Sequence, residues 1–304
     1  DGKEIERKAV AKERPLPNSV RFKTVYIIIG ALGLIVAVLS AVFMRESDVY
    51  IESRIAYLKS SDEEREKAKA EKKDEAKRGG FINGFIYCFK HSQLRFLLIT
   101  MCIVMFSYVL TENYNTIIGC GSLVKQGLEI SSENYKLVRN LTDQSTLIYP
   151  ITCGLLVLSP SLFSDKLGRK KSAIIYGALA LTFYVLFYIG SVNVWNPYIL
   201  GGLIGAACGA VWSCGDLILL MVTESSATNM RVSANACVTL LSGLIYLLGN
   251  MLVGSLAKGL GSDEYLGIIT IAIVVIGLVS GLILMIFTVR ETKGTDLHSV
   301  TYDD

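Results

Sequence analysis

The stretch from 172 to 215 reads SAIIYGALALTFYVLFYIGSVNVWNPYILGGLIGAACGAVWSCG and contains no charged residue. A helix needs roughly 20 apolar residues to cross the hydrocarbon core of a bilayer, so this run is long enough for two crossings. Its middle, SVNVWNP at 191–197, holds the polar and proline residues that are typical of a turn. The stretch therefore predicts two membrane-spanning helices joined by a short connection.

Similar apolar runs lie on both sides of this stretch. Uncharged segments occupy 24–44, 96–111, 144–164, 232–257 and 265–289. The run at 96–111 continues past Glu112 to Gly119, with one charge inside it. Together the runs predict seven membrane-spanning helices, at about 24–43, 95–119, 144–163, 172–190, 198–221, 232–256 and 265–289.

The composition supports the same fold class. Apolar residues make up 52% of the 304 residues and charged residues only 19%, against roughly 25% in soluble domains. Mean hydropathy is positive, at +0.47. The predicted fold class is all-α, a polytopic membrane protein whose partner is the lipid bilayer, and a soluble fold is excluded.

The composition also excludes several classes of function. The chain has two histidines and seven cysteines, and no two cysteines form a CxxC pair, so we expect neither a metal site nor a disulfide framework. It contains no GxGxxG or P-loop pattern. The net charge is only +3 and the basic residues lie between spans, which argues against a nucleic-acid partner. Because the spans hold no nucleophile–base pair, we expect no enzyme, no catalytic residues and no cofactor.

The basic residues are divided unequally between the two sides of the predicted spans. The side that includes the charged stretch 45–95 carries 19 of them and the other side carries 11, so the positive-inside rule predicts that the first side is cytoplasmic. We therefore expect a multi-pass protein of the cell membrane with a cytoplasmic C-terminus. Its expected parts are an external polar segment (1–23), a first span (24–44), a cytoplasmic charged helical loop (45–94), a six-helix block (95–289) and a cytoplasmic tail (290–304).

One short loop carries a family signature. Residues 161–170 read SLFSDKLGRK, which resembles the loop motif G-x-x-x-D-[RK]-x-G-R-[RK] of the major facilitator superfamily, with Ser161 at the first glycine position. A tight turn between two helices needs a flexible residue, here Gly168. Asp165 is placed to pair with Arg169, and Lys170 adds to the basic cluster.

Three further stretches support the resemblance in the order in which the family has them. Residues 223–231, TESSATNMR, are similar to the family's E-x-x-P-T-x-x-R stretch, with Ala227 in place of the proline. The segment 290–297, RETKGTDL, resembles the E-T-K-G-x-x-L ending of the sugar-porter branch, and 44–47, MRES, resembles its P-E-S-P-R stretch.

The resemblance covers about 24–297 and maps the chain onto helices six to twelve of a twelve-helix transporter. It implies a major facilitator fold, in which two six-helix bundles rock around a central cavity with the substrate near the bilayer midplane. It also implies that the N-terminal six-helix half belongs to the same full-length chain, which an external amino end would fit. The resemblance assigns Asp165, Gly168, Arg169, Lys170, Glu224 and Arg231 to a gate that stabilises one conformation.

Ionisable residues inside a membrane are costly and point to function. Two carboxylates lie within predicted spans, Glu112 in the second and Asp216 in the fifth. Helical spacing places Tyr108, Asn115 and Gly119 on the face of Glu112, and Gly205, Gly209, Trp212 and Thr223 on that of Asp216. The sixth span adds Thr239, Ser242, Tyr246 and Asn250 at comparable spacing. The candidates for binding substrate or protons are Asp216, Glu112, Trp212, Tyr108, Asn115, Tyr246 and Asn250.

Desolvation raises the pKa of a buried carboxylate toward neutrality, so either acid could carry a proton. The sequence therefore predicts a secondary active transporter that moves a small polar solute by alternating access, coupled to H⁺, as in a sugar symporter. Two alternatives stay open: an antiporter that exchanges an organic cation or drug for a proton, and a non-transporting half that acts as a sensor or is an inactive fragment. The glycines at 201, 205 and 209 have a purely structural interpretation, a close helix-packing face.

Overall fold

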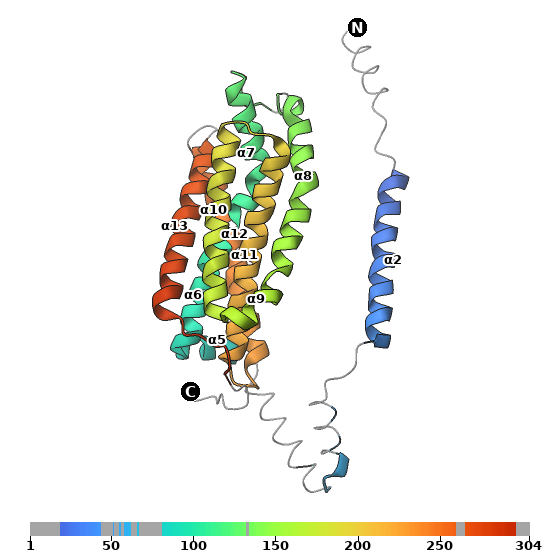
Figure 1. Cartoon of the computed structure of the whole chain (residues 1–304), viewed down its shortest axis with the longest axis vertical. Helices are drawn as coiled ribbons and strands as arrows, with labels where there is room; N and C mark the ends of the chain where they lie inside the picture. Colours follow the sequence, from blue (N-terminus) through green and yellow to red (C-terminus); the bar gives the residue numbers. More distant parts are fainter. Residues whose placement is uncertain are drawn as a thin grey trace. The chain divides into compact units, whose positions relative to one another are not determined.

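The computed structural model describes residues 19–43, 51, 55, 58–61, 66, 81–131, 134–259 and 265–295. Every regular element in this part of the chain is a helix (Figure 1). The chain divides into two compact units, residues 1–70 and 71–304, and each is described by itself. Residues 1–18 and most of 44–80 lie outside the described residues, so the predicted external segment and charged loop are largely not covered.

Among the described residues of the first unit there is one long helix, α2 (Ser19–Phe43). It includes the predicted first span and begins five residues earlier than expected. Its apolar side chains, such as Ile28, Leu32 and Ile35, are exposed within the unit. An apolar helix without a buried face is typical of a segment surrounded by lipid.

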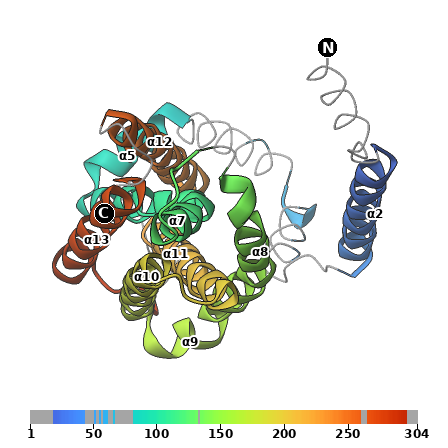
Figure 2. The same ribbon diagram turned by 90° about the horizontal axis from the view of Figure 1, so that it is seen from above.

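The second unit is a helical bundle (Figure 2). Its elements are α5 (Phe81–Lys90), α6 (Ser92–Phe106), α7 (Val109–Lys125), α8 (Tyr135–Leu158), α9 (Pro160–Leu167), α10 (Arg169–Val192), α11 (Pro197–Glu224), α12 (Arg231–Gly259) and α13 (Tyr265–Thr288). Within the described residues, six helical segments are long and apolar enough to cross a membrane, the first and second being α6 with α7 and α8 with α9. The predicted all-α membrane fold is confirmed.

Three features of the second unit differ most from the sequence prediction. The helix α5 lies in the predicted charged loop and packs against α12, because its sequence FINGFIYCFK has one apolar face. The second span is interrupted at Ser107, whose hydroxyl bonds back to the Val104 carbonyl, a contact that bends helices. The third span begins nine residues early, at Tyr135, because its first turns are too polar to register as an apolar run. Pro160, which lacks an N–H, then starts α9.

The helix α11 packs closely against α8 through glycines. A Cβ atom on Gly201 would lie 2.1 Å from the Ser145 carbonyl oxygen, and one on Gly205 would lie 2.3 Å from that of Tyr149. At Gly209 the nearest atom would be the Cys153 carbonyl oxygen, at 2.6 Å. The series is thus a helix-packing face, as its spacing predicts.

We predict that Gly201→Ala destabilises the bundle by about 1–3 kcal/mol, because the new methyl group must push α8 away. The neighbouring Gly202 provides a matched control, since a Cβ there would meet only Ile148 Cγ2, at 3.8 Å, and Thr152 Cγ2, at 4.0 Å. Gly202→Ala should be neutral or stabilise by up to about 1 kcal/mol through helix propensity. Thermal unfolding in detergent measures both variants, and equal melting temperatures would contradict the packing role of Gly201.

Candidate functional site

Three aromatic side chains from three helices meet near the middle of their spans, and we call Tyr108, Trp212 and Tyr246 the aromatic cluster. Tyr108 lies at the break between α6 and α7, Trp212 lies on α11 and Tyr246 on α12. The ring of Tyr108 is edge-on to Trp212, with centroids 5.7 Å apart, and edge-on to Tyr246, at 5.6 Å. Edge-to-face contacts at this separation are favourable, and Tyr108 joins the other two rings.

A carboxylate lies beside this cluster. Glu112 is one turn beyond Tyr108 on α7, its side chain is exposed in the bundle, and it interacts with the Tyr246 hydroxyl. The side-chain amide of Asn250 donates to the Tyr246 carbonyl oxygen at 3.4 Å. The structure thus brings together Tyr108, Glu112, Trp212, Tyr246 and Asn250, five of the seven predicted site residues.

The second carboxylate, Asp216, shares the exposed face of α11 with Trp212. Between Ile204 and Ile218 every residue is buried except these two, which are four positions apart. Asp216 is therefore exposed in this bundle. The residues around Asp216 on α11 pack against α8, α10 and α6. The narrow face of α11 that remains exposed carries Asp216 and the Trp212 indole.

Asn115 lies apart from the aromatic cluster. It is exposed and lines a cavity of about 270 Å³ between α7 and α8, together with Tyr135, Lys136 and Arg139. Gly119, expected on the same face as Glu112, is buried, and a Cβ there would meet the Tyr135 ring at 2.5 Å. The face predicted for α7 therefore does not extend as far as Gly119.

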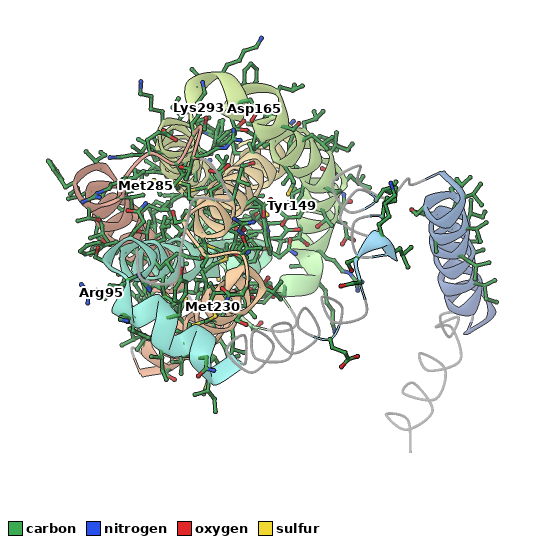
Figure 3. The ribbon with its side chains drawn as sticks, turned by 90° about the horizontal axis from the view of Figure 1, so that it is seen from below. Arg95, Tyr149, Asp165, Met230, Met285 and Lys293 are labelled. Atoms are coloured by element: carbon green, nitrogen blue, oxygen red, sulfur yellow. The ribbon has the colours of Figure 1, made fainter. Side chains whose placement is uncertain are left out.

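Behind the aromatic cluster lies a polar contact that the prediction missed. The Tyr149 hydroxyl donates to Cys208 Sγ at 3.0 Å, and the Cys208 thiol lies 3.7 Å from the Tyr108 hydroxyl. Figure 3 labels Tyr149, which comes from α8. Cys208 precedes Trp212 by four positions on α11, so helical spacing could have identified it.

The predicted gate residues gather where α9, α10, α11 and the C-terminal segment meet. This is the end of the bundle opposite the C-terminus of α7 and the N-terminus of α8. Arg169 pairs with Asp165 and, through Nε, with Glu224 at 3.1 Å. Thr292 donates its hydroxyl to the other oxygen of Glu224. Arg169 is only 16% exposed, so it links α9, α11 and the segment after α13 from a largely buried position. We call Asp165, Arg169, Glu224, Glu291 and Thr292 the charge network.

Glu291 caps the start of α10. One of its oxygens accepts the backbone N–H of Arg169 at 2.8 Å, and its carboxylate also accepts those of Lys170, Thr292 and Lys293. Gly168 makes this approach feasible, because its φ is +97° and a Cβ there would lie 2.6 Å from a Glu291 oxygen. Partial burial alone would raise the pKa of Glu291, but the N–H donors outweigh it and hold that pKa below its ordinary value.

The remaining gate residues bind backbone carbonyls at the same end. The Lys170 ammonium donates to the Ile286 carbonyl on α13 at 2.8 Å, and Arg231 Nε donates to that of Ser226 at 3.1 Å. The Lys293 ammonium donates to the Lys166 carbonyl at 2.9 Å, and Figure 3 shows Lys293 beside Asp165. The contact made by Lys293 joins the tail to the short turn at Gly168.

Comparison with known families supports the fold described above. The family model described as "Sugar (and other) transporter" matches residues 17–303. The chain therefore belongs to this family of the major facilitator superfamily, and it is a multi-pass membrane protein of a transporter family. No curated protein matches the chain.

We predict that Glu291→Gln lowers the melting temperature at pH 7 by about 1–3 °C, because a charge-assisted helix cap is lost. The pKa of Glu291 is lowered on folding, so its carboxylate stabilises the protein above pH 4.5, the ordinary value, and loses this effect as the pH falls through the folded pKa. The difference in melting temperature between wild type and Glu291→Gln should therefore shrink as the pH is lowered. Glu129→Gln, in the loop after α7, is the control. A difference in melting temperature that does not shrink as the pH falls below 4.5 would contradict the cap.

Proposed function

We propose that this transporter is driven by protons, with Asp216 or Glu112 as the proton carrier. The observation that carries the proposal is the pair of carboxylates exposed on spanning helices of the bundle, one beside Tyr246 and the other beside Trp212. The family makes the protein a carrier of sugars or other solutes.

The exposed face of α11 suits a central cavity better than lipid. A carboxylate on a lipid-facing surface costs several kcal/mol, and Trp212 and Asp216 are adjacent there with Tyr108 and Tyr246 close by. In our proposal the N-terminal half, from the same full-length chain, covers this face and leaves a water-filled cavity at the midplane. The charge-network end, with the C-terminus, then faces the cytoplasm, where its basic residues favour it.

In the transport cycle the carboxylate is protonated on the side of higher proton concentration and releases the proton on the other. Closing the cavity excludes water, which favours the neutral acid, and reopening restores the charged form. The charge network supports one closed state, because Arg169 holds α9 and α11 together only while Asp165 and Glu224 lie within reach. Rocking of the two halves would separate or regroup such contacts.

We predict that Asp216→Asn abolishes accumulation driven by a pH gradient and leaves substrate exchange within about twofold, because an amide cannot carry the proton. The full-length chain in proteoliposomes is tested with radiolabelled D-glucose and tetraethylammonium, under gradients of either sign. Asp143→Asn is the control, because Asp143 is exposed and paired with Arg139 at 3.8 Å. Unchanged accumulation by Asp216→Asn would exclude Asp216 as the carrier. A wild type that moves neither probe under any gradient would exclude both D-glucose and tetraethylammonium as substrates.

A second candidate is exchange of an organic cation for a proton. The aromatic cluster with Glu112 at its edge favours it, because aromatic faces and a carboxylate together attract a cation. Sugars, in contrast, offer no charge for the carboxylate to balance.

We predict for this case that Glu112→Gln weakens tetraethylammonium uptake at least tenfold, whereas D-glucose uptake, if present in the wild type, falls less. Loss of one ion pair in a partly desolvated site supports that magnitude. Thr116→Val, one turn further along α7, is the control. Equal loss for both probes, or none for tetraethylammonium, would contradict recognition of the cation by Glu112.

A further inference from the structure

A second cavity, separate from the aromatic cluster, lies where α7 and α10 end and α13 begins. Its volume is about 490 Å³. In the view along the bundle α10 and α13 lie on the outer side of α7 (Figure 2), so the cavity is on the periphery of the unit. We call it the α7–α10–α13 cavity.

The floor of this cavity is apolar and includes a glycine. Gly267 on α13 is buried, and a Cβ there would lie 3.4 Å from the Tyr188 ring and 3.6 Å from Ile117. A leucine at this position would place its larger side chain against Tyr188 and Ile117, which line the same cavity. The floor suits a hydrocarbon chain, since it offers apolar contact and few groups that require hydrogen bonds.

The mouth of the cavity combines a fixed cation with exposed apolar side chains. The Lys125 ammonium donates to the Asn193 carbonyl oxygen at 2.9 Å, which holds it at the mouth and leaves two further N–H groups for a ligand. Among the described residues that line the cavity, Lys125 alone is charged. Around it Val192 is 54% exposed and Ile268 is 55% exposed.

The position of the cavity along the helices adds to the argument. Lysine and tyrosine at the ends of spanning helices lie at the level of the lipid head groups, and Tyr265 at the start of α13 lines the same mouth. A ligand in this place meets hydrocarbon below and a cation at the head-group level. An anionic amphiphile satisfies both parts.

We propose that the α7–α10–α13 cavity binds an anionic phospholipid, with an acyl chain over Gly267 and the phosphate paired with Lys125. This site lies outside the proposed transport pathway and goes beyond the proposed function. Native mass spectrometry of the full-length chain, released from micelles with equimolar phosphatidylglycerol and phosphatidylcholine of identical chains, tests it. Phosphatidylglycerol adducts should exceed phosphatidylcholine adducts by about fivefold, the preference expected for one lysine near the head groups.

The variants test two contributions separately, the charge of Lys125 and the space for the acyl chain over Gly267. Lys125→Gln should bring the adduct ratio to about one, and Lys125→Arg should keep the preference. Gly267→Leu should remove both lipids, whereas the control Gly277→Leu on the same helix should retain them, since a Cβ there meets only the Ile103 carbonyl oxygen, at 3.9 Å. Ile268→Trp, which blocks the mouth from an exposed position, replaces Gly267→Leu if that protein is not monodisperse.

Three results would overturn the proposal. They are an unchanged ratio in Lys125→Gln, adducts that survive both Gly267→Leu and Ile268→Trp, and displacement of the lipid by millimolar sn-glycerol 1-phosphate. The last result would assign the cavity to a small soluble anion. None of these measurements depends on transport, so failure of the lipid site and failure of proton coupling are distinguishable.

Discussion

The close approach of α8 to α11 determines which side of α11 stays uncovered. Gly201, Gly205 and Gly209 allow the two backbones to meet, and α10 and α6 pack against other sides of α11. In hydrocarbon the backbone groups are already bonded within each helix, so small residues that permit such contact largely decide how helices associate. What remains exposed is the narrow face with Trp212 and Asp216, and the aromatic cluster forms along it.

The charge network depends on a different constraint, the short turn between α9 and α10. Only Gly168 separates the two helices, with φ at +97°, and this brings the free N–H groups of α10 to the surface of the bundle end. Glu291 accepts them, and Arg169 then reaches both Asp165 and Glu224. The tail after α13 is thereby fixed to the α9–α10 turn, so a motion of α11 against α9 has to break or exchange ionic contacts.

The sequence predicts the spans well because roughly 20 apolar residues are a strong signal. It predicts their ends poorly. The α5 segment directly follows a charged stretch, so its short apolar face does not register as a span. The break at Ser107 depends on a hydroxyl contact that no hydropathy pattern contains. Among the site residues, helical spacing selects Tyr108, Glu112, Trp212 and Tyr246. The exposure of Asp216 and the cap formed by Glu291 depend on which helices are neighbours, and a single sequence does not contain that information.

The separation of the two carboxylates distinguishes the two mechanisms. If one carboxylate binds both proton and cation, the two ligands compete, and linkage makes each release the other; the cycle is then an exchange. If the proton binds at Asp216 and the substrate contacts the aromatic cluster with Glu112, both ligands are held together and transport is a symport. Glu112 follows Tyr108 on α7 and Asp216 follows Trp212 on α11, one turn on in each case. The aromatic cluster thus lies between two acids on different helices. A symporter requires that Asp216→Asn loses proton coupling and that Glu112→Gln loses substrate binding.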